Sequence, residues 1–183
     1  APLKRSSLPC FTVDTQRGML VGTGDSKMLL CWDINTASVR FAGYPPNGWV
    51  WWQRAMLLDP ATGKFWSMDA SSSTNRFMSF DPATLRFDRY DILVPTNAVT
   101  GKKGNLRGHT SRPAKDGYFY WATSSGALFK FKPEAPGGPV VIPCGVTWDK
   151  GRDVLQIALS PGGRYLYYQP KDYPSPLVQV DVT

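Results

Sequence analysis

Residues 157–167 read Ile157-Ala-Leu-Ser-Pro-Gly-Gly163-Arg-Tyr-Leu-Tyr167, with two apolar segments on either side of a polar turn. Gly163 ends the turn, and glycine adopts the positive φ of a tight hairpin turn at little steric cost. This stretch therefore predicts a β-hairpin. The same layout occurs at residues 11–21, 56–66 and 111–121. The turn glycines, which are Gly18, Gly63, Gly117 and Gly163, recur at intervals of 45, 54 and 46 residues.

A second landmark follows each hairpin, and it has a similar period. It is an alternating strand that ends in an Asp-x-x-Thr-like turn, as in Leu29-Leu-Cys-Trp-Asp33-Ile-Asn-Thr36. The corresponding residues in the four copies, which are Asp33, Asp81, Lys132 and Asp181, are 48, 51 and 49 residues apart. Three copies continue into a further short strand, at residues 39–42, 86–90 and 140–142. The chain is therefore predicted to be a structural repeat with a period near 50.

Four short strands per repeat is the pattern of β-propeller blades. No segment of ten or more residues shows sustained helical periodicity with a capped start, which predicts an all-β fold. We expect a β-propeller of about four blades, each of four antiparallel strands, at residues 9–43, 49–95, 107–143 and 153–183. A β-sandwich is the alternative, but it does not require this recurrence.

The repeat stops after the third strand of the last blade. Residues 1–8 are a candidate for the missing outer strand, which would close a four-bladed ring. Propellers more often have six to eight blades, so we favour part of a larger ring over a closed four-bladed one. Pairing of two copies as a homodimer is a further route to closure.

Composition limits the classes of function. The 183 residues carry a formal net charge of +7, and 42% of them are hydrophobic. No apolar run approaches the roughly 20 residues of a membrane span. The positive charge favours an anionic partner, but it is scattered and no nucleic-acid-binding motif accompanies it. Cys10, Cys31 and Cys144 fit either one disulfide with a free thiol or three buried thiols.

Three stretches resemble β-propeller repeat proteins. They are Asp59-Pro-Ala-Thr-Gly63, Asp81-Pro-Ala-Thr84 and Ala158-Leu-Ser-Pro-Gly-Gly-Arg-Tyr-Leu-Tyr167. The chain lacks the Gly-His and Trp-Asp pairs of the WD40 type, and it looks nearer to secreted propellers of the lyase and lactonase type. That resemblance implies a secreted or periplasmic protein. With one histidine and no ligand-rich loop, we expect neither a cofactor nor a metal site.

The loops at one end of the blades are expected to form the functional face, because loops on a rigid scaffold commonly carry the site. They bring cations together with flat aromatic rings, which suits an anionic polysaccharide: guanidinium groups pair with carboxylates, and indoles stack on sugar rings. The predicted substrate-binding residues are Arg54, Trp51, Trp52, Lys150 and Arg152.

His109 is the candidate catalytic base. Counted from the turn glycines, it occupies a position that is apolar in the other repeats, and such breaks in a pattern concentrate at functional sites. Abstraction of a proton beside a carboxylate, as in β-elimination, needs a base and a cation. Tyr173 and Arg107 complete this predicted lyase site. A buried histidine bonded to the backbone is the alternative interpretation of His109.

Two other functions compete with the lyase. One is a non-catalytic propeller that binds a protein partner through the charged face. The other is a metal-dependent hydrolase of the lactonase type, for which the chain is short of clustered carboxylates.

Overall fold

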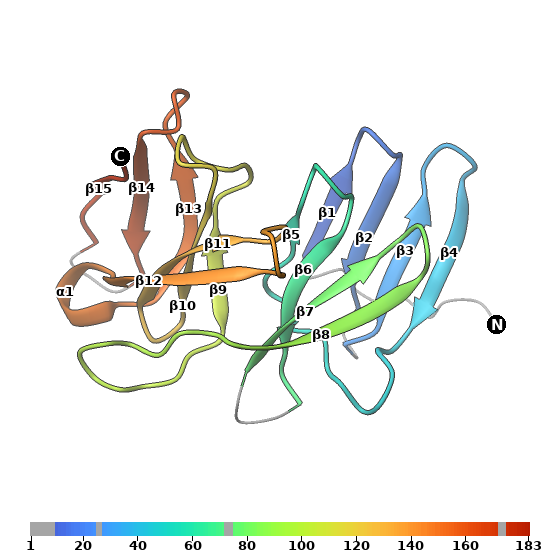
Figure 1. Ribbon diagram of the computed structural model, residues 1–183, viewed down its shortest axis with the longest axis horizontal. Coiled ribbons are helices and arrows are strands. Elements are labelled where there is room, and N and C mark those ends of the chain that lie inside the picture. Colours follow the sequence, from blue (N-terminus) through green and yellow to red (C-terminus); the bar gives the residue numbers. More distant parts are fainter. Residues whose placement is uncertain (1–9, 25–26, 72–74, 172–174) are drawn as a thin grey trace. The chain divides into compact units, whose positions relative to one another are not determined.

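The computed structural model describes residues 10–24, 27–71, 75–171 and 175–183. The predicted closing strand at residues 1–8 lies outside these ranges. The described residues form four antiparallel sheets and one short helix, and the chain divides into two compact units, Ala1–Leu93 and Val94–Thr183 (Figure 1).

The first unit holds two four-stranded sheets. The first sheet contains β1 (Cys10–Asp14), β2 (Met19–Thr23), β3 (Leu29–Asp33) and β4 (Ser38–Gly43), paired in that order. The second sheet contains β5 (Leu57–Leu58), β6 (Phe65–Asp69), β7 (Arg76–Asp81) and β8 (Arg86–Leu93), also paired in order.

The second unit holds one sheet of four strands and one of three. The first contains β9 (Leu106–His109), β10 (Phe119–Thr123), β11 (Ala127–Lys132) and β12 (Val140–Val146). The helix α1 (Trp148–Gly151) leads to the last sheet, which contains β13 (Val154–Leu159), β14 (Tyr165–Pro170) and β15 (Val178–Asp181). Sheets of sequential antiparallel strands, repeated along the chain, are propeller blades. The predicted all-β propeller class is confirmed, with three strands in the fourth sheet.

The predicted hairpin glycines have the expected conformation. Gly18, Gly63, Gly117 and Gly163 all have positive φ, between 66° and 81°. Gly63 is also closely covered, since a Cβ there would lie 2.7 Å from the Cδ atom of Arg17. The positive φ favours glycine at this turn, and a Cβ there would also displace the Arg17 side chain.

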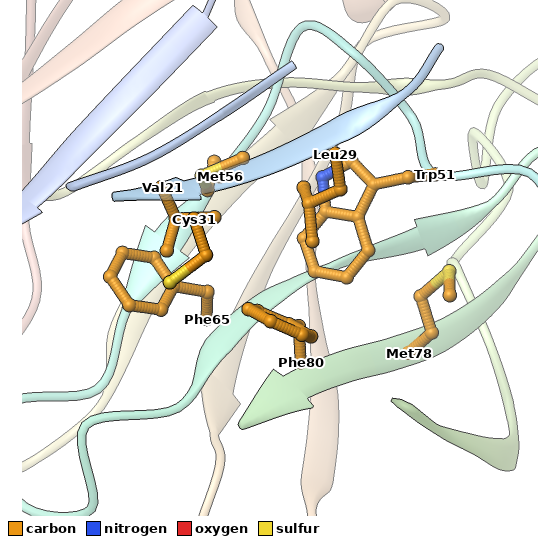
Figure 2. Close-up of a cluster of buried hydrophobic side chains, with 8 residues drawn as sticks. All are labelled: Val21, Leu29, Cys31, Trp51, Met56, Phe65, Met78 and Phe80. Atoms are coloured by element: carbon orange, nitrogen blue, oxygen red, sulfur yellow. The ribbon is translucent and has the colours of Figure 1, made fainter. Parts of the chain in front are cut away.

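The core of the first unit lies between its two sheets (Figure 2). The buried side chains are those of Val21, Leu29, Cys31, Trp51, Met56, Phe65, Met78 and Phe80. Each fully buried large apolar side chain contributes about 1.5–3 kcal/mol, so this shared core holds the two sheets together.

The second unit has its own core, which also joins two sheets. It contains Ala114, Tyr120, Ala122, Leu128, Val154, Ile157, Leu166 and Tyr168. Strands β9 and β13 approach closely here, because a Cβ on Gly108 would lie 2.7 Å from the Cα atom of Gln156. Glycine thus permits the two strands to pack backbone against backbone.

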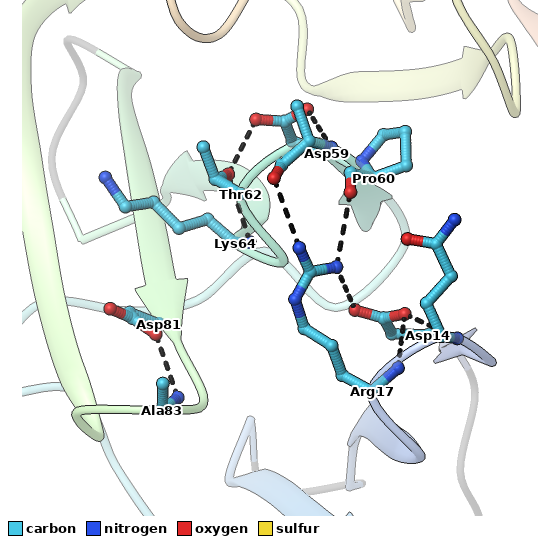
Figure 3. A network of polar contacts seen from close by, with 10 residues as sticks. Asp14, Arg17, Asp59, Pro60, Thr62, Lys64, Asp81 and Ala83 are labelled. Atoms are coloured by element: carbon cyan, nitrogen blue, oxygen red, sulfur yellow. Dashed lines mark hydrogen bonds and ion pairs between the residues drawn. The ribbon is translucent and has the colours of Figure 1, made fainter.

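An arginine links the turns of neighbouring sheets in each unit. In the first unit, Arg17 is held by Asp14 at 3.0 Å and donates to the carbonyl oxygens of Pro60 (3.2 Å) and Ala61 (3.1 Å) (Figure 3). In the second unit, Arg112 donates to the carbonyl oxygens of Ser160 (2.7 Å) and Pro161 (2.8 Å). The two arginines occupy different positions relative to their turn glycines, yet both connect successive hairpins.

No helix within the described residues is long and apolar enough to cross a membrane.

The three cysteines were expected to form either one disulfide or none. Cys10, Cys31 and Cys144 are free thiols, but only Cys31 is buried, whereas Cys10 is half-buried and Cys144 is exposed, so the structure matches neither of the two alternatives in full.

Candidate functional site

One buried asparagine organises the loops beside α1 in the second unit. Asn97, which is 1% exposed, donates from Nδ2 to the carbonyl oxygens of Ser125 (2.7 Å) and Lys150 (3.0 Å). Its backbone N–H donates to the carbonyl oxygen of Lys102 at 2.9 Å. Asn97 therefore ties the loop before β9, the β10–β11 turn and α1 to one another.

The α1 segment is held in an unusual backbone conformation. Asp149 and Lys150 have φ values of 52° and 63°, and Gly151 has a φ of 101°. Left-handed conformations of residues other than glycine cost on the order of 1–3 kcal/mol and persist where surrounding contacts impose them. One such contact is the hydrogen bond from the backbone N–H of Trp148 to the Tyr168 hydroxyl (3.0 Å). A Cβ on Gly151 would collide with the Asn97 amide.

The surface of these loops is basic. Lys102, Lys103 and Lys150 are exposed, and the ring of Trp148 is 39% exposed. Residues 97–107 and 147–153 together contain five Lys or Arg and two Asp, a surplus of three positive charges. We call this set of two segments the loop face. Asn97, in the first segment, bonds the backbone carbonyl oxygens of Lys102 and Lys150, so the backbones of the two segments are held together.

The two arginines of the loop face already pair with carboxylates. Arg107 lies 3.3 Å from Asp153, with side chains 16% and 14% exposed. Arg152 contacts Asp149 at 2.7 Å. Arg107 Nε and Asp153 Oδ1 are buried and have no hydrogen-bond partner among the described residues. Buried polar atoms are normally bonded to protein or water, so this pair retains the capacity for a further polar contact.

His109 lies on β9 opposite Trp121. Its ring centroid is 5.3 Å from that of Trp121, and its Nδ1 atom is 3.1 Å from the carbonyl oxygen of Thr110. The backbone contact expected for a structural histidine is therefore present. The positions aligned with His109 differ in environment, since Ala55 is 1% exposed and Leu155 is 61% exposed. The connection from β9 to β10 is longer than the β1–β2 turn, so counting from the turn glycine does not align these strands.

The other predicted residues lie elsewhere. Trp51, Trp52 and Arg54 belong to the first unit, and Tyr173 lies outside the described residues. Arg54 is exposed and Trp52 is half-buried. Trp51 is completely buried in the core of the first unit (Figure 2). An indole with no exposed surface offers no platform to a sugar, so the expectation of substrate binding by Trp51 is corrected to a packing role.

Sequence reasoning missed Asn97 and Trp148. Asn97 did carry a signal, because its Oδ1 accepts the backbone N–H groups of Val99 (2.8 Å) and Thr100 (2.9 Å). Asp33 makes the same pattern with the N–H groups two and three residues ahead. Asn97-x-x-Thr100 is thus another copy of the Asp-x-x-Thr-like turn motif. It does not belong to the series that recurs about every 50 residues.

No group of three or more histidine, cysteine, aspartate or glutamate side chains within the described residues could hold a metal ion.

The sheets and their order define the chain as a β-propeller protein. Many solved structures share this fold, and two of them illustrate the likeness. A chain of the nidogen–laminin complex aligns with a TM-score of 0.60 and 14% identity, over 98% of this chain and 60% of that one. A putative gluconolactonase aligns with a TM-score of 0.59 and 11% identity, over 94% of this chain and 62% of that one. The chain thus spans about 60% of the length of either structure.

No family model matches the chain, and no curated protein matches it in sequence. At these identities the likeness concerns the fold alone.

Proposed function

We propose that the chain binds an anionic polysaccharide through the loop face of its second unit. The observation that carries this proposal is the position of Asn97, which bonds the carbonyl oxygens of both Lys102 and Lys150. The backbones of two exposed lysines on separate segments are thereby bonded to the same residue. Holding these backbones in advance reduces the ordering cost of binding an anion.

The exposed indole of Trp148 favours a sugar over a simple anion. It is adjacent to Asp149 and Lys150 in a segment that accepts a hydrogen bond from Asn97 and donates one to the Tyr168 hydroxyl. Flat aromatic rings offer large apolar contact area with a defined orientation. A chain of acidic sugars combines ring faces for Trp148 with carboxylates for the lysines.

The proposal concerns binding and not elimination. The cation that elimination requires beside the substrate carboxylate was assigned to Arg107, whose charge is balanced by Asp153 at 3.3 Å. His109 contacts the carbonyl oxygen of Thr110 and the ring of Trp121. Lyase activity at His109, Tyr173 and Arg107 stays a prediction.

Calorimetric titration with oligogalacturonate at low salt tests the proposal. Lys102→Glu and Lys150→Glu should each weaken binding about tenfold, because each exchanges an attraction for a repulsion. Higher salt should weaken wild-type binding, since these charges are exposed to solvent.

Lys115→Glu is the matched control. Lys115 is an exposed lysine of the same unit, in the connection between β9 and β10. Equal losses in all three variants would show that net charge alone attracts the ligand and would contradict the proposal. Absence of binding by folded wild-type protein would instead favour the protein-interaction alternative.

A further inference from the structure

A second group of cations lies in the first unit, at an open pocket of about 280 Å³ on the second sheet. It is lined by Arg76, Arg89, Tyr90 and Asp91. This volume is just below the range of about 300–1,000 Å³ that is usual for ligand pockets, so only a small molecule would fit. None of the four residues was singled out from the sequence.

Arg89 is held rigidly at this pocket. Its Nη1 donates to Asp69 Oδ2 at 3.0 Å, and its guanidinium carbon lies 4.9 Å from the ring centroid of Trp49. Asp69 is itself 1% exposed, and its Oδ1 accepts the backbone N–H groups of Val50 (3.0 Å) and Ser71 (2.9 Å). A cation fixed by a buried carboxylate on one side and an indole on another keeps its remaining N–H groups in a defined direction.

Arg76 is held much more weakly. Its Nε and Nη2 both contact Oδ1 of Asp91, at 3.0 and 2.9 Å. Asp91 is 91% exposed. Ion pairs of this exposure are worth about 0–1 kcal/mol, so another carboxylate can replace Asp91 at Arg76 with little loss.

We propose that this pocket binds a small organic carboxylate between Arg76 and Arg89, with Asp91 as an intramolecular competitor. Arg76 and Arg89 side chains are 34% and 33% exposed, which leaves donors accessible to a ligand. The fork of a guanidinium matches the two oxygens of a carboxylate. The incoming carboxylate takes the place of Asp91 on Arg76 and contacts the N–H groups of Arg89 that do not face Asp69. This site is separate from the loop face and does not depend on it.

The test is a titration of the full chain with D-glucuronate, monitored by NMR of the arginine Nε–H signals. Those of Arg76 and Arg89 should shift and saturate together, whereas methyl β-D-glucoside, which lacks the carboxylate, should leave both unchanged. Equal shifts with the glucoside, or no shift with glucuronate, would overturn the proposal.

Two variants separate a binding role from a structural one. Asp91→Ala should tighten glucuronate binding about twofold to fivefold, because it removes the competitor. Arg76→Ala should weaken it about tenfold. Arg89 is left intact because it is the partner of buried Asp69. Unchanged or weaker glucuronate binding by the Asp91→Ala variant would overturn the proposal. This outcome decides the question even if Arg76→Ala lowers the stability of the protein. Lys150→Glu, on the loop face, should leave glucuronate binding at this pocket unchanged.

Discussion

The side-chain amide of Asn97 lies 3.0 Å from the carbonyl oxygen of Lys150, which is 53 residues further along the chain. With the bond to Ser125, it makes one buried side chain the link from its own loop to two others, and the backbone N–H of Asn97 also donates to the carbonyl oxygen of Lys102 within that loop. The cations proposed to meet a ligand stand on two of these loops. Their backbone positions are therefore held by a residue that need not touch the ligand.

Asn97→Asp tests this supporting role. The change keeps acceptor oxygens for Val99 and Thr100 but removes the Nδ2 donor and introduces a buried charge. We expect the free energy of unfolding of the second unit to fall by about 2–4 kcal/mol and oligogalacturonate binding to weaken. Urea denaturation and calorimetry measure the two effects. Asn47→Asp, at an exposed turn of the first unit, is the control, and equal behaviour of the two variants would contradict the account.

The turn-linking arginines lead to a second prediction. Arg112→Ala removes two hydrogen bonds to carbonyl oxygens of the next hairpin and should lower the free energy of unfolding by about 1 kcal/mol, a modest value because the side chain is exposed to water. Arg17→Ala removes two such bonds and also the ion pair of Asp14, whose side chain is 2% exposed, so its loss should be larger, about 1–3 kcal/mol. Arg86 is 73% exposed and pairs with Asp88 at 3.3 Å, so Arg86→Ala should change stability by less. An equal loss in all three variants would refute the linking role.

The lowered pKa of Asp69 should make the stability of the protein depend on pH. Burial alone would raise its pKa, but hydrogen bonds from Ser71, Val50 and Arg89 outweigh burial and hold the pKa of Asp69 below the ordinary 3.8. Because the pKa is lower in the folded state, this stabilisation is present at neutral pH and is lost as the pH falls through the folded pKa.

Asp69→Asn should therefore destabilise the protein at pH 7, by about 2 kcal/mol. The difference from the wild type should shrink as the pH is lowered from 4 to 2. Denaturation curves of both proteins across this range make the comparison. A difference that grows at low pH would contradict the assignment.

The cysteines provide a fourth prediction. Burial raises the pKa of Cys31 to about 11, and its side chain is fully buried in the core of the first unit. Cys144 is exposed on β12. At pH 8 a thiol reagent should label Cys144 in the native protein and Cys31 only after the first unit unfolds. Mass spectrometry of the labelled peptides shows the order, and native labelling of Cys31 would mean that this core opens.

The repeat could be predicted because its signals are local. Gly63 and Gly163 mark turns that need positive φ. The side chain of Asp81 accepts the backbone N–H of Ala83, two residues further along, and so stabilises its own turn. Such interactions span a few residues and recur with the period of the fold. The site could not be predicted in this way. The bond from Asn97 to Lys150 goes to a backbone carbonyl, which every residue possesses, so nothing in the sequence marks the partner.

The same reasoning explains the outcomes for Trp51 and His109. Trp51 is in a segment of aromatic residues that is compatible with a binding platform but more often packs in a core, and in the structure it belongs to the core cluster with Phe80 and Leu29. His109 was compared with Leu155 by counting from turn glycines, and the longer β9–β10 connection makes that comparison invalid.

The most direct test of the central claim is an amide NMR map of the second unit's loops in the full chain during titration with oligogalacturonate. We predict saturable shifts concentrated in residues 97–103 and 147–153, absent from the Lys102→Glu/Lys150→Glu double variant. Any shifts at Arg76 and Arg89 would report the separate pocket and would persist in that variant. Saturable binding that leaves residues 97–103 and 147–153 unperturbed would contradict the account.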